Sequence, residues 1–384
     1  MKIIHICLAC FYIEGMGYQE NILPKEHHDL GYDVTVITSD FSFNSRGEIT
    51  SKAEREYVNK DGVNVKVITR KRDKSLFSKF NKFDGLYNEL LKIRPDIVFV
   101  HGGQFVSLKD VIRYIKNNSG TKMYIDQHGD FYNMPISNMK SKIVQKFIYG
   151  HYIRSSIKYC SKFWGVTPWR CQYLHDVYGV PLKKIGLLVM GGDDEYIHFD
   201  KKASIRNEVR RNLNLSDNDF VVVTGGKIDE TKNIHLLMQA ISEINKENLK
   251  LIVFGQPNKE MSDLILKLSG DKHIRNIGWI DSFAVYDYFM ASDLAVFPGT
   301  HSVLWEQAAA CGIPMIVKNW KGMHHVDVGG NCLFLYNDSI EEIKDVIVGV
   351  LENKEEYNTM LKVATEKGTA VFSYKEIAKR AIEI

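Results

Sequence analysis

The sequence predicts an α/β chain with two doubly wound domains. Apolar runs typical of buried strands alternate with helical segments along the 384 residues, and a buried strand followed by a glycine-bearing loop occurs near the start and again at 220–226. Strand–helix–strand units of this kind imply right-handed crossovers and parallel sheets, and the length suits two separate cores. We assign residues 1–190 to the first domain and 191–369 to the second, and we expect 370–384 to pack back on the first.

The composition is that of a globular protein, with 45% apolar and 25% charged residues. The sequence has no run of eighteen apolar residues, and its first fifteen residues lack a small-residue cleavage site, so we expect neither a spanning helix nor a signal peptide. Cys7 and Cys10 have metal-like spacing, but no second pair completes a zinc set. Buried, reduced thiols are expected instead, which favours a cytoplasmic location.

The net charge of +3 is unevenly distributed. Residues 1–190 hold 28 Lys and Arg against 18 Asp and Glu, a net +10, whereas 191–384 hold 22 against 29, a net −7. Basic side chains alternate with apolar ones at 66–82 and 140–162. Each segment alone could be a solvated helix face, but together they predict peripheral contact with an anionic surface on the inner face of a membrane. No nucleic-acid-binding motif accompanies the charge, so nucleic acid is not an expected partner.

The first domain opens with a strand at 2–9 and a loop that contains Gly15 and Gly17. This loop is not G-x-G-x-x-G, so a dinucleotide-binding enzyme is not supported, and an ordinary tight turn is the alternative to a ligand-binding loop. Further strands are expected at 31–38, 63–69, 95–102 and 122–129, with helices near 78–93, 105–117 and 138–160.

Two of these strands end in histidines, His101 and His128. Ligands of open α/β sheets bind beyond the carboxyl ends of the strands, so both positions are candidates for a site. His128 is the stronger one because Asp126 and Asp130 flank it. A buried structural histidine is the alternative.

The second domain begins with a strand at 220–226 and a loop that contains Gly226, Lys227 and Lys232. Two ammonium groups beside a glycine turn could neutralise a diphosphate, although unrelated surface lysines are the alternative. The next strands, at 249–256 and 274–281, carry Gly255, Trp279 and Ile280 at their ends.

The most informative stretch is FPGTHSVLWEQAAACGIPMIVKNWK, residues 297–321. Its strand stops at Pro298, Ser302 is expected to cap a helix whose first turn is 303–305, and Gly312 suits a left-handed C-cap. Amides of the 301–304 loop could bind phosphate oxygens, and Glu306 would then face a hydroxyl-bearing neighbour. A ribose-diphosphate site is predicted, with a simple cap and a solvated Glu306 as the alternative.

This stretch resembles the signature region of the retaining glycosyltransferases of family four, where a Pro-Ser loop precedes a helix E-A-x-A-C-G-x-P-V. The segment DQHGD is similar to the family's T-x-H-D, and GGKIDETK is similar to its G-R-L-x-x-x-K. The resemblance covers nearly all of the chain and is strongest at 221–337. It implies the GT-B fold, which consists of two facing doubly wound Rossmann-like domains with a C-terminal crossover helix.

The resemblance also implies roles for individual residues. The expected catalytic residues are His128, Lys232 and Glu306. The expected donor and diphosphate contacts are Gly15, Gly17, Gly226, Lys227, Lys232, His301, Ser302, Val303 and Leu304. The expected nucleoside contacts are Gly255, Trp279, Ile280 and Glu306.

The implied activity is transfer of a hexose from a nucleotide-diphosphate sugar, expected to be UDP-linked, to a saccharide or lipid-linked acceptor with retention of configuration. The implied role is in surface polysaccharide or glycoconjugate biosynthesis. We expect no cofactor and no metal ion, because no D-x-D pair occupies a suitable loop and the lysines can supply the charge.

One departure from the family pattern leaves alternatives open. The family carries two glutamates eight positions apart, and Pro298 stands eight positions before Glu306, in a shorter loop. Either Thr300, His301 or Ser302 replaces the missing sugar contact, or the donor sugar is held differently. A catalytically inactive donor-binding partner of another transferase, a sugar-nucleotide 2-epimerase and a membrane scaffold are the other readings.

Overall fold

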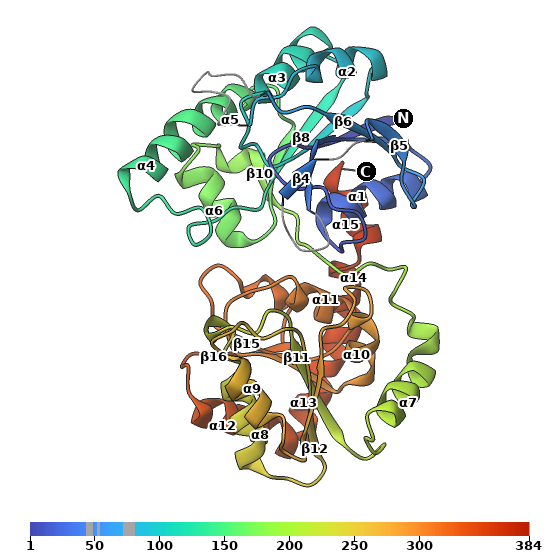
Figure 1. Cartoon of the computed structure of the whole chain (residues 1–384), viewed down its shortest axis with the longest axis vertical. Helices are drawn as coiled ribbons and strands as arrows, with labels where there is room; N and C mark the ends of the chain where they lie inside the picture. The colour runs from blue at the N-terminus through green and yellow to red at the C-terminus, as the bar shows by residue number, and fades with distance from the viewer. Residues whose placement is uncertain (44–48, 52–53, 72–80, 384) are drawn as a thin grey trace. The chain divides into compact units, whose positions relative to one another are not determined.

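The computed structural model describes residues 1–43, 49–51, 54–71 and 81–383 (Figure 1). They divide into two compact units. Unit 1 is Met1–Val189 together with Ile377–Ile384, and unit 2 is Met190–Glu376. Within the described ranges, no helix has both the length and the apolar character needed to cross a bilayer.

Unit 1 contains an eight-stranded sheet in the order β10-β9-β8-β7-β1-β2-β6-β5. All neighbours pair in parallel except β5 and β6. The strands are β1 (Lys2–Cys7), β2 (Asp33–Ser39), β5 (Glu56–Val58), β6 (Asn64–Ile68), β7 (Ile97–His101), β8 (Lys122–Gln127), β9 (Lys162–Gly165) and β10 (Ile185–Leu187). A separate antiparallel pair is formed by β3 (Phe41–Phe43) and β4 (Ile49–Ser51). The direction of strand succession reverses between β1 and β7.

The helices of unit 1 cover this sheet and close its core. They are α1 (Gln19–Asp29), α2 (Leu86–Ile93), α3 (Leu108–Asn117), α4 (Met139–Lys142), the π-helical η2 (Ile143–Tyr149), α5 (Gly150–Ser156) and α6 (Pro168–Asp176). The end of α15 (Tyr374–Ala381) belongs to the same unit and lies beside α1 (Figure 1). The Trp164 indole donates to the Ala381 carbonyl at 3.0 Å, which ties α15 to β9.

Unit 2 contains a six-stranded, all-parallel sheet in the order β13-β12-β11-β14-β15-β16. Its strands are β11 (Phe220–Gly225), β12 (Leu249–Phe254), β13 (Ile274–Gly278), β14 (Leu294–Phe297), β15 (Met315–Lys318) and β16 (Cys332–Leu335). Its main helices are α7 (Lys202–Asn212), α8 (Ile234–Ile244), α9 (Ser262–Leu268), α10 (Val285–Ala291), α11 (Leu304–Ala310), α12 (Ile340–Glu352) and α13 (Lys354–Val363). Here the succession reverses between β11 and β14.

The predicted fold class is confirmed, because both sheets are doubly wound and their parallel strands occupy the expected segments. Most of these strands are rich in Val, Ile, Leu and Phe and are largely buried, because helices cover both faces of a parallel sheet. One core cluster of unit 2 joins α8, α9 and α12 to the strands. The carboxyl ends of the parallel strands bring the loops of each unit to one edge of its sheet.

Candidate functional site

The predicted diphosphate residues of unit 2 lie on the two loops that follow β11 and β14, at the point where the strand order reverses. Such switch points are where open α/β sheets bind ligands. The Lys232 ammonium donates to the Thr300 carbonyl at 2.7 Å and to the His301 carbonyl at 3.0 Å. The Thr300 amide donates to the Thr231 carbonyl at 3.0 Å, so the two loops are bonded to each other.

Gly299 permits this close approach. A Cβ atom at this position would lie 2.3 Å from the Thr231 carbonyl oxygen and 2.4 Å from backbone atoms of Lys232. The net pKa of Lys232 is lowered to about 8, chiefly by burial, which the Asp229 carboxylate opposes and Lys227 reinforces. An ammonium has three N–H donors, so two carbonyls leave one donor of Lys232 for a ligand.

Lys227 and Gly226 occupy the same loop. The Lys227 side chain is 72% exposed and forms an ion pair with Asp229 at 3.0 Å. Gly226 has a φ of 108°, and a Cβ atom there would meet the Leu304 side chain at 2.9 Å. The β11 loop therefore contacts the first turn of α11.

The expectation that Ser302 caps α11 is wrong. The helix begins at Leu304, Val303 occupies the N-cap position, and no side chain makes a capping hydrogen bond. Among the residues described, the amides of Ser302, Val303 and Leu304 donate to no protein acceptor. Gly312 has the expected left-handed conformation, with a φ of 66°.

A cavity of about 10 Å³ lies beneath these loops, lined in part by Lys232, Thr300 and Ser302. The hydroxyl of Thr224 and the indole N–H of Trp305 line it too, and both are buried without a partner in the described part of the chain. This volume suits no more than one water molecule. A phosphate group would therefore contact the rim of the loops rather than this cavity.

Glu306 is fully buried, which excludes the solvated alternative. Its Oε1 accepts from Nε2 of His301 and from Nε2 of His325, each at 2.8 Å, and we call these three residues the Glu306 cluster. Burial alone would raise the pKa of Glu306, but the two imidazoles hold it well below its usual range. Within the described residues, Glu306 Oε2 and His325 Nδ1 have no hydrogen-bond partner.

His325 was not predicted from the sequence. It lies in the short 3-10 turn His324–Val326, nineteen residues beyond Glu306. No motif connects it to the β14 loop, and only the packing of α11 against this turn brings the two together.

The expected nucleoside residues lie on the same edge of the sheet. Gly255 follows β12 and donates to the Gly278 carbonyl at 2.7 Å, and Trp279 and Ile280 follow β13. The Trp279 side chain is 70% exposed, so one face of its indole can stack on a base.

In unit 1, His128 and His101 both contact Asp126. Asp126 Oδ2 accepts from His101 Nδ1 at 2.9 Å and from His128 Nε2 at 3.1 Å, and we call these residues the Asp126 cluster. Burial lowers the pKa of His128, but Asp126 outweighs it and the net shift is upward. Asp130 does not complete this cluster, because its carboxylate binds Arg170 at 3.3 Å and caps the following turn.

The two glycines predicted in the loop after β1, Gly15 and Gly17, differ in conformation and burial. Gly15 has a φ of 79°, and a Cβ atom there would meet nothing within 4 Å. Gly17 is buried just before α1. The loop therefore contains one turn that requires a left-handed residue, at Gly15.

Each cluster could in principle ligate a metal, because its three ligating atoms lie within 4.8 Å of one another. Around a tetrahedral ion with bonds of about 2.0–2.2 Å, however, the ligand atoms are roughly 3.3 Å apart. The 2.8 Å contacts of the Glu306 cluster are shorter, and in both clusters the two imidazoles point at one oxygen. We therefore assign both sets of contacts to hydrogen bonds.

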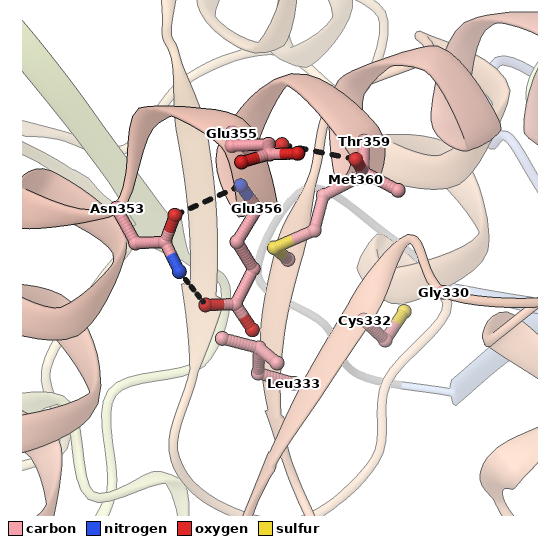
Figure 2. Close-up of a pocket in the computed structure, with 8 residues that line it drawn as sticks. All are labelled: Gly330, Cys332, Leu333, Asn353, Glu355, Glu356, Thr359 and Met360. Atoms are coloured by element: carbon pink, nitrogen blue, oxygen red, sulfur yellow. Dashed lines mark hydrogen bonds between the residues drawn. The ribbon is translucent and has the colours of Figure 1, made fainter.

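A larger cavity of about 420 Å³ lies elsewhere in unit 2, beside β16 and the start of α13 (Figure 2). Figure 2 shows Asn353 there with its side chain bound to the amide and the carboxylate of Glu356, each at 3.1 Å. None of the predicted site residues lines this cavity. Asn353 and Glu356 are engaged in a helix cap and the Thr359 hydroxyl donates to the Glu355 carbonyl, so we assign no site to this cavity.

Comparison with known proteins gives one family match and many similar folds. Residues 205–367 match the family model of glycosyl transferases group 1. No sequence among the curated proteins matches the chain.

Solved structures with similar folds cover essentially the whole chain. A glycosyltransferase from Rickettsia africae superimposes with a TM-score of 0.70 and 14% identity over 100% of this chain and 97% of its own. HepE from Anabaena, in complex with UDP and glucose, gives 0.68 and 14% over 100% and 98%. A putative UDP-N-acetylglucosamine 2-epimerase from Listeria monocytogenes gives 0.60 and 14% over 99% and 94%. The two units thus have the GT-B fold, and within unit 2 residues 205–367 match the model of the glycosyl transferases group 1 family.

Proposed function

We propose that the protein is a retaining hexosyltransferase that uses a UDP-sugar and no metal ion. The acceptor would be a saccharide or a lipid-linked saccharide of a surface polysaccharide or glycoconjugate, made on the cytoplasmic side of a membrane. The observation that carries the proposal is the meeting of Lys232, the 300–304 loop and the Glu306 cluster at one edge of the unit 2 sheet. The likeness to HepE, whose structure contains UDP and glucose, supports the choice of UDP.

The diphosphate would bind where the two switch-point loops meet. The remaining N–H of Lys232, the exposed Lys227 ammonium and the amides of 302–304 can all donate to phosphate oxygens. Their effect on rate comes from charge, because the leaving diphosphate gains negative charge as the glycosidic bond breaks. This cationic set performs the task that a metal ion performs in other transferases.

The ribose would bind at Glu306. Its Oε1 already accepts from two imidazoles, whereas Oε2 is buried without a partner among the described residues. A ribose hydroxyl that donates to Oε2 would satisfy this oxygen, which makes the site suited to a sugar hydroxyl. Gly255, Trp279 and Ile280 would contact the base.

Transfer with retention requires the acceptor hydroxyl to attack the anomeric carbon from the face that the diphosphate leaves. The bond from the anomeric carbon to phosphate oxygen breaks, the bond to the acceptor oxygen forms, and the acceptor proton passes to the departing phosphate. We propose His128 as the contact to the donor sugar in unit 1, with Gly15 and Gly17 beside it. Thr300, His301 and Ser302 remain the candidates for the sugar contact that the missing glutamate provides elsewhere.

We also propose that unit 1 contacts an anionic membrane through α4 and η2. Met139, Ile143 and Phe147 recur every four residues and are 73%, 44% and 62% exposed. Lys140, Lys142 and Lys146 alternate with them, which is the pattern of a helix that lies in an anionic lipid interface. The other predicted basic segment falls largely at 72–80, outside the described residues.

The direct test is turnover. Purified protein is incubated with a panel of UDP-hexoses and saccharide or lipid-linked acceptors, with and without EDTA, and the product is examined for its anomeric configuration. We expect UDP release that depends on acceptor, is unaffected by EDTA and gives a retained anomer. UDP binding without turnover would favour an inactive partner, and conversion of the sugar nucleotide without acceptor would favour an epimerase.

A further inference from the structure

Unit 1 contains a row of three buried histidines that the proposed reaction does not use directly. We call His27, His5 and His101 the histidine file. His27 Nδ1 contacts His5 Nε2 at 2.9 Å, and His5 Nδ1 contacts His101 Nε2 at 3.0 Å. All three side chains have at most 1% of their surface exposed.

Both ends of the file meet groups that can only accept a hydrogen bond. At one end His27 Nε2 lies 2.9 Å from the backbone carbonyl of Ala378 in α15. At the other end His101 Nδ1 lies 2.9 Å from Asp126 Oδ2. From the Ala378 carbonyl to the Asp126 carboxylate, the three imidazoles therefore make four successive hydrogen-bond contacts.

Four such contacts need four protons, but three neutral imidazoles supply only three. A neutral imidazole has one N–H and one lone pair. If His27 donates to the carbonyl, then His5 donates to His27 and His101 donates to His5, which leaves the lone pair of His101 facing Asp126. If the polarity is reversed, the lone pair of His27 faces the carbonyl instead. One surplus proton removes the conflict in either case.

The surroundings place that proton on an imidazole rather than on Asp126. This carboxylate also accepts from the Gly102 amide at 2.9 Å, from His128 and from the Gln19 amide group at 3.3 Å. Although burial alone would raise its pKa, His128 and His101 hold the pKa well below its usual range. A carboxylate with this many donors stays ionised.

Within the file, the proton is placed at the Asp126 end. Burial lowers the pKa of His27 to about 4, and burial with the two neighbouring histidines lowers the pKa of His5 well below its usual value. His101 alone touches a carboxylate. The other ionisable groups that act on these residues are Cys10 and Glu20 beside the Asp126 cluster and Arg170 beside His128.

We propose that the histidine file stores one surplus proton as an imidazolium on His101, and that this buried charge positions His128 by keeping Asp126 a carboxylate. His128 then donates Nε2–H to Asp126. Its side chain is one-third exposed, so the other edge of the ring is free to face the donor sugar in the proposed reaction. Its role in transfer rests on the proposed function, but the stored proton does not.

His27 is the residue that forces the proton to be stored. In His27→Leu the carbonyl end is lost, His5 can donate Nδ1–H to His101, and His101 can donate Nδ1–H to Asp126. Two contacts then need two protons, and two neutral imidazoles supply them. In His27→Gln the amide can donate to Ala378 and accept from His5, so the surplus proton stays.

The test is ring-nitrogen NMR of the full chain labelled with ¹⁵N-histidine, recorded from pH 6 to 9. We expect wild type to show one buried ring, absent in His101→Asn, that keeps protons on both nitrogens at pH 8. The signals of His128 are recognised by their loss in His128→Asn. The doubly protonated ring should disappear in His27→Leu and persist in His27→Gln and in the distant control His175→Gln.

Two results would overturn the proposal. One is a wild-type file in which all three rings carry a single proton at pH 7. The other is a folded His27→Leu variant that keeps the imidazolium. Neither measurement depends on turnover, so the outcome is separate from the fate of the proposed transferase activity.

Discussion

The two units place the same arrangement at corresponding positions, a buried carboxylate between two imidazoles near the carboxyl edge of a parallel sheet. In unit 1 Asp126 accepts from four donors, and the histidine file continues the network to α15. In unit 2 Glu306 accepts from two, and its other oxygen and His325 Nδ1 find no partner among the described residues. The first network is completed by protein groups, whereas the second keeps two unsatisfied atoms, and it is there that we propose a ribose hydroxyl binds.

The largest expected effect is the loss of folding stability when either carboxylate is removed, and we expect a greater loss for Asp126 than for Glu306. Asp126→Ala leaves four donors without their acceptor, one of them the proposed His101 imidazolium, and we expect a loss of about 3–5 kcal/mol in the free energy of unfolding of unit 1. Glu306→Ala leaves only two donors without their acceptor, so about 2–3 kcal/mol is expected for unit 2. Urea denaturation of both variants, followed by tryptophan fluorescence and circular dichroism, measures the difference. Equal losses would contradict the comparison.

The second expected effect is the response to UDP. A ligand at a hundred times its dissociation constant stabilises the protein by about 2.7 kcal/mol. We expect this stabilisation in wild type and in Asp126→Asn, because Asp126 is not among the proposed nucleotide contacts. It should be absent in Lys232→Ala and in Glu306→Gln. Lys246→Ala is the matched control in unit 2, since its ammonium pairs with Glu352 on the surface. Full stabilisation of both site variants would refute the site.

The third expected effect is the pH dependence of UDP binding to unit 2. Because burial lowers the pKa of Lys232 to about 8, this lysine loses its charge in the free protein as the pH rises through 8. Diphosphate favours the charged form, so the dissociation constant of UDP should rise above pH 8 by up to about tenfold per pH unit. Titration calorimetry from pH 6.5 to 9.5 measures this rise. Lys232→Arg stays charged and should give a flat profile, and a flat wild-type profile would exclude Lys232 as a phosphate contact.

The smallest expected effect is on membrane binding, and it compares one exposed lysine from each unit. A basic residue near an anionic bilayer contributes about 1 kcal/mol, so Lys142→Ala in unit 1 should weaken binding to vesicles of phosphatidylglycerol and phosphatidylcholine about fivefold. Lys246→Ala in the acidic unit 2 should leave it unchanged. Flotation with both variants measures the ratio, and an equal loss would mean that the contact is not confined to unit 1.

The fold could be predicted because most parallel strands covered on both faces are rich in apolar residues, as in KIIHIC and FVVVTG, and helical segments separate them. The convergence of Lys232 with the β14 loop was predictable in outline from the switch-point rule. Its two bonds to carbonyls were not, because they depend on how closely Gly299 lets the loops approach. Ser302 satisfied the sequence preference for a cap, but the turn places Val303 there instead.

The histidines show why the other side-chain contacts of the two units could not be predicted from the sequence. His5 lies in an apolar strand, so the pattern indicated only that it is buried. Its partners come from α1 and from the end of β7, and no spacing along the chain links positions 5, 27 and 101. His325 reaches Glu306 from a turn outside any motif. Such contacts arise from tertiary packing, which local patterns do not encode.

The last residues of the described chain determine the order in which the units can be finished during synthesis. Carbonyls of Ala378, Ala381 and Ile382 accept from His27, Trp164 and Tyr124 of unit 1. Unit 2 is complete once residue 376 has left the ribosome, but unit 1, although it starts first, still lacks these acceptors at that moment. A nascent first unit therefore lacks the acceptors for these three donors for the whole time that the second is being made, and it becomes complete only after the second unit.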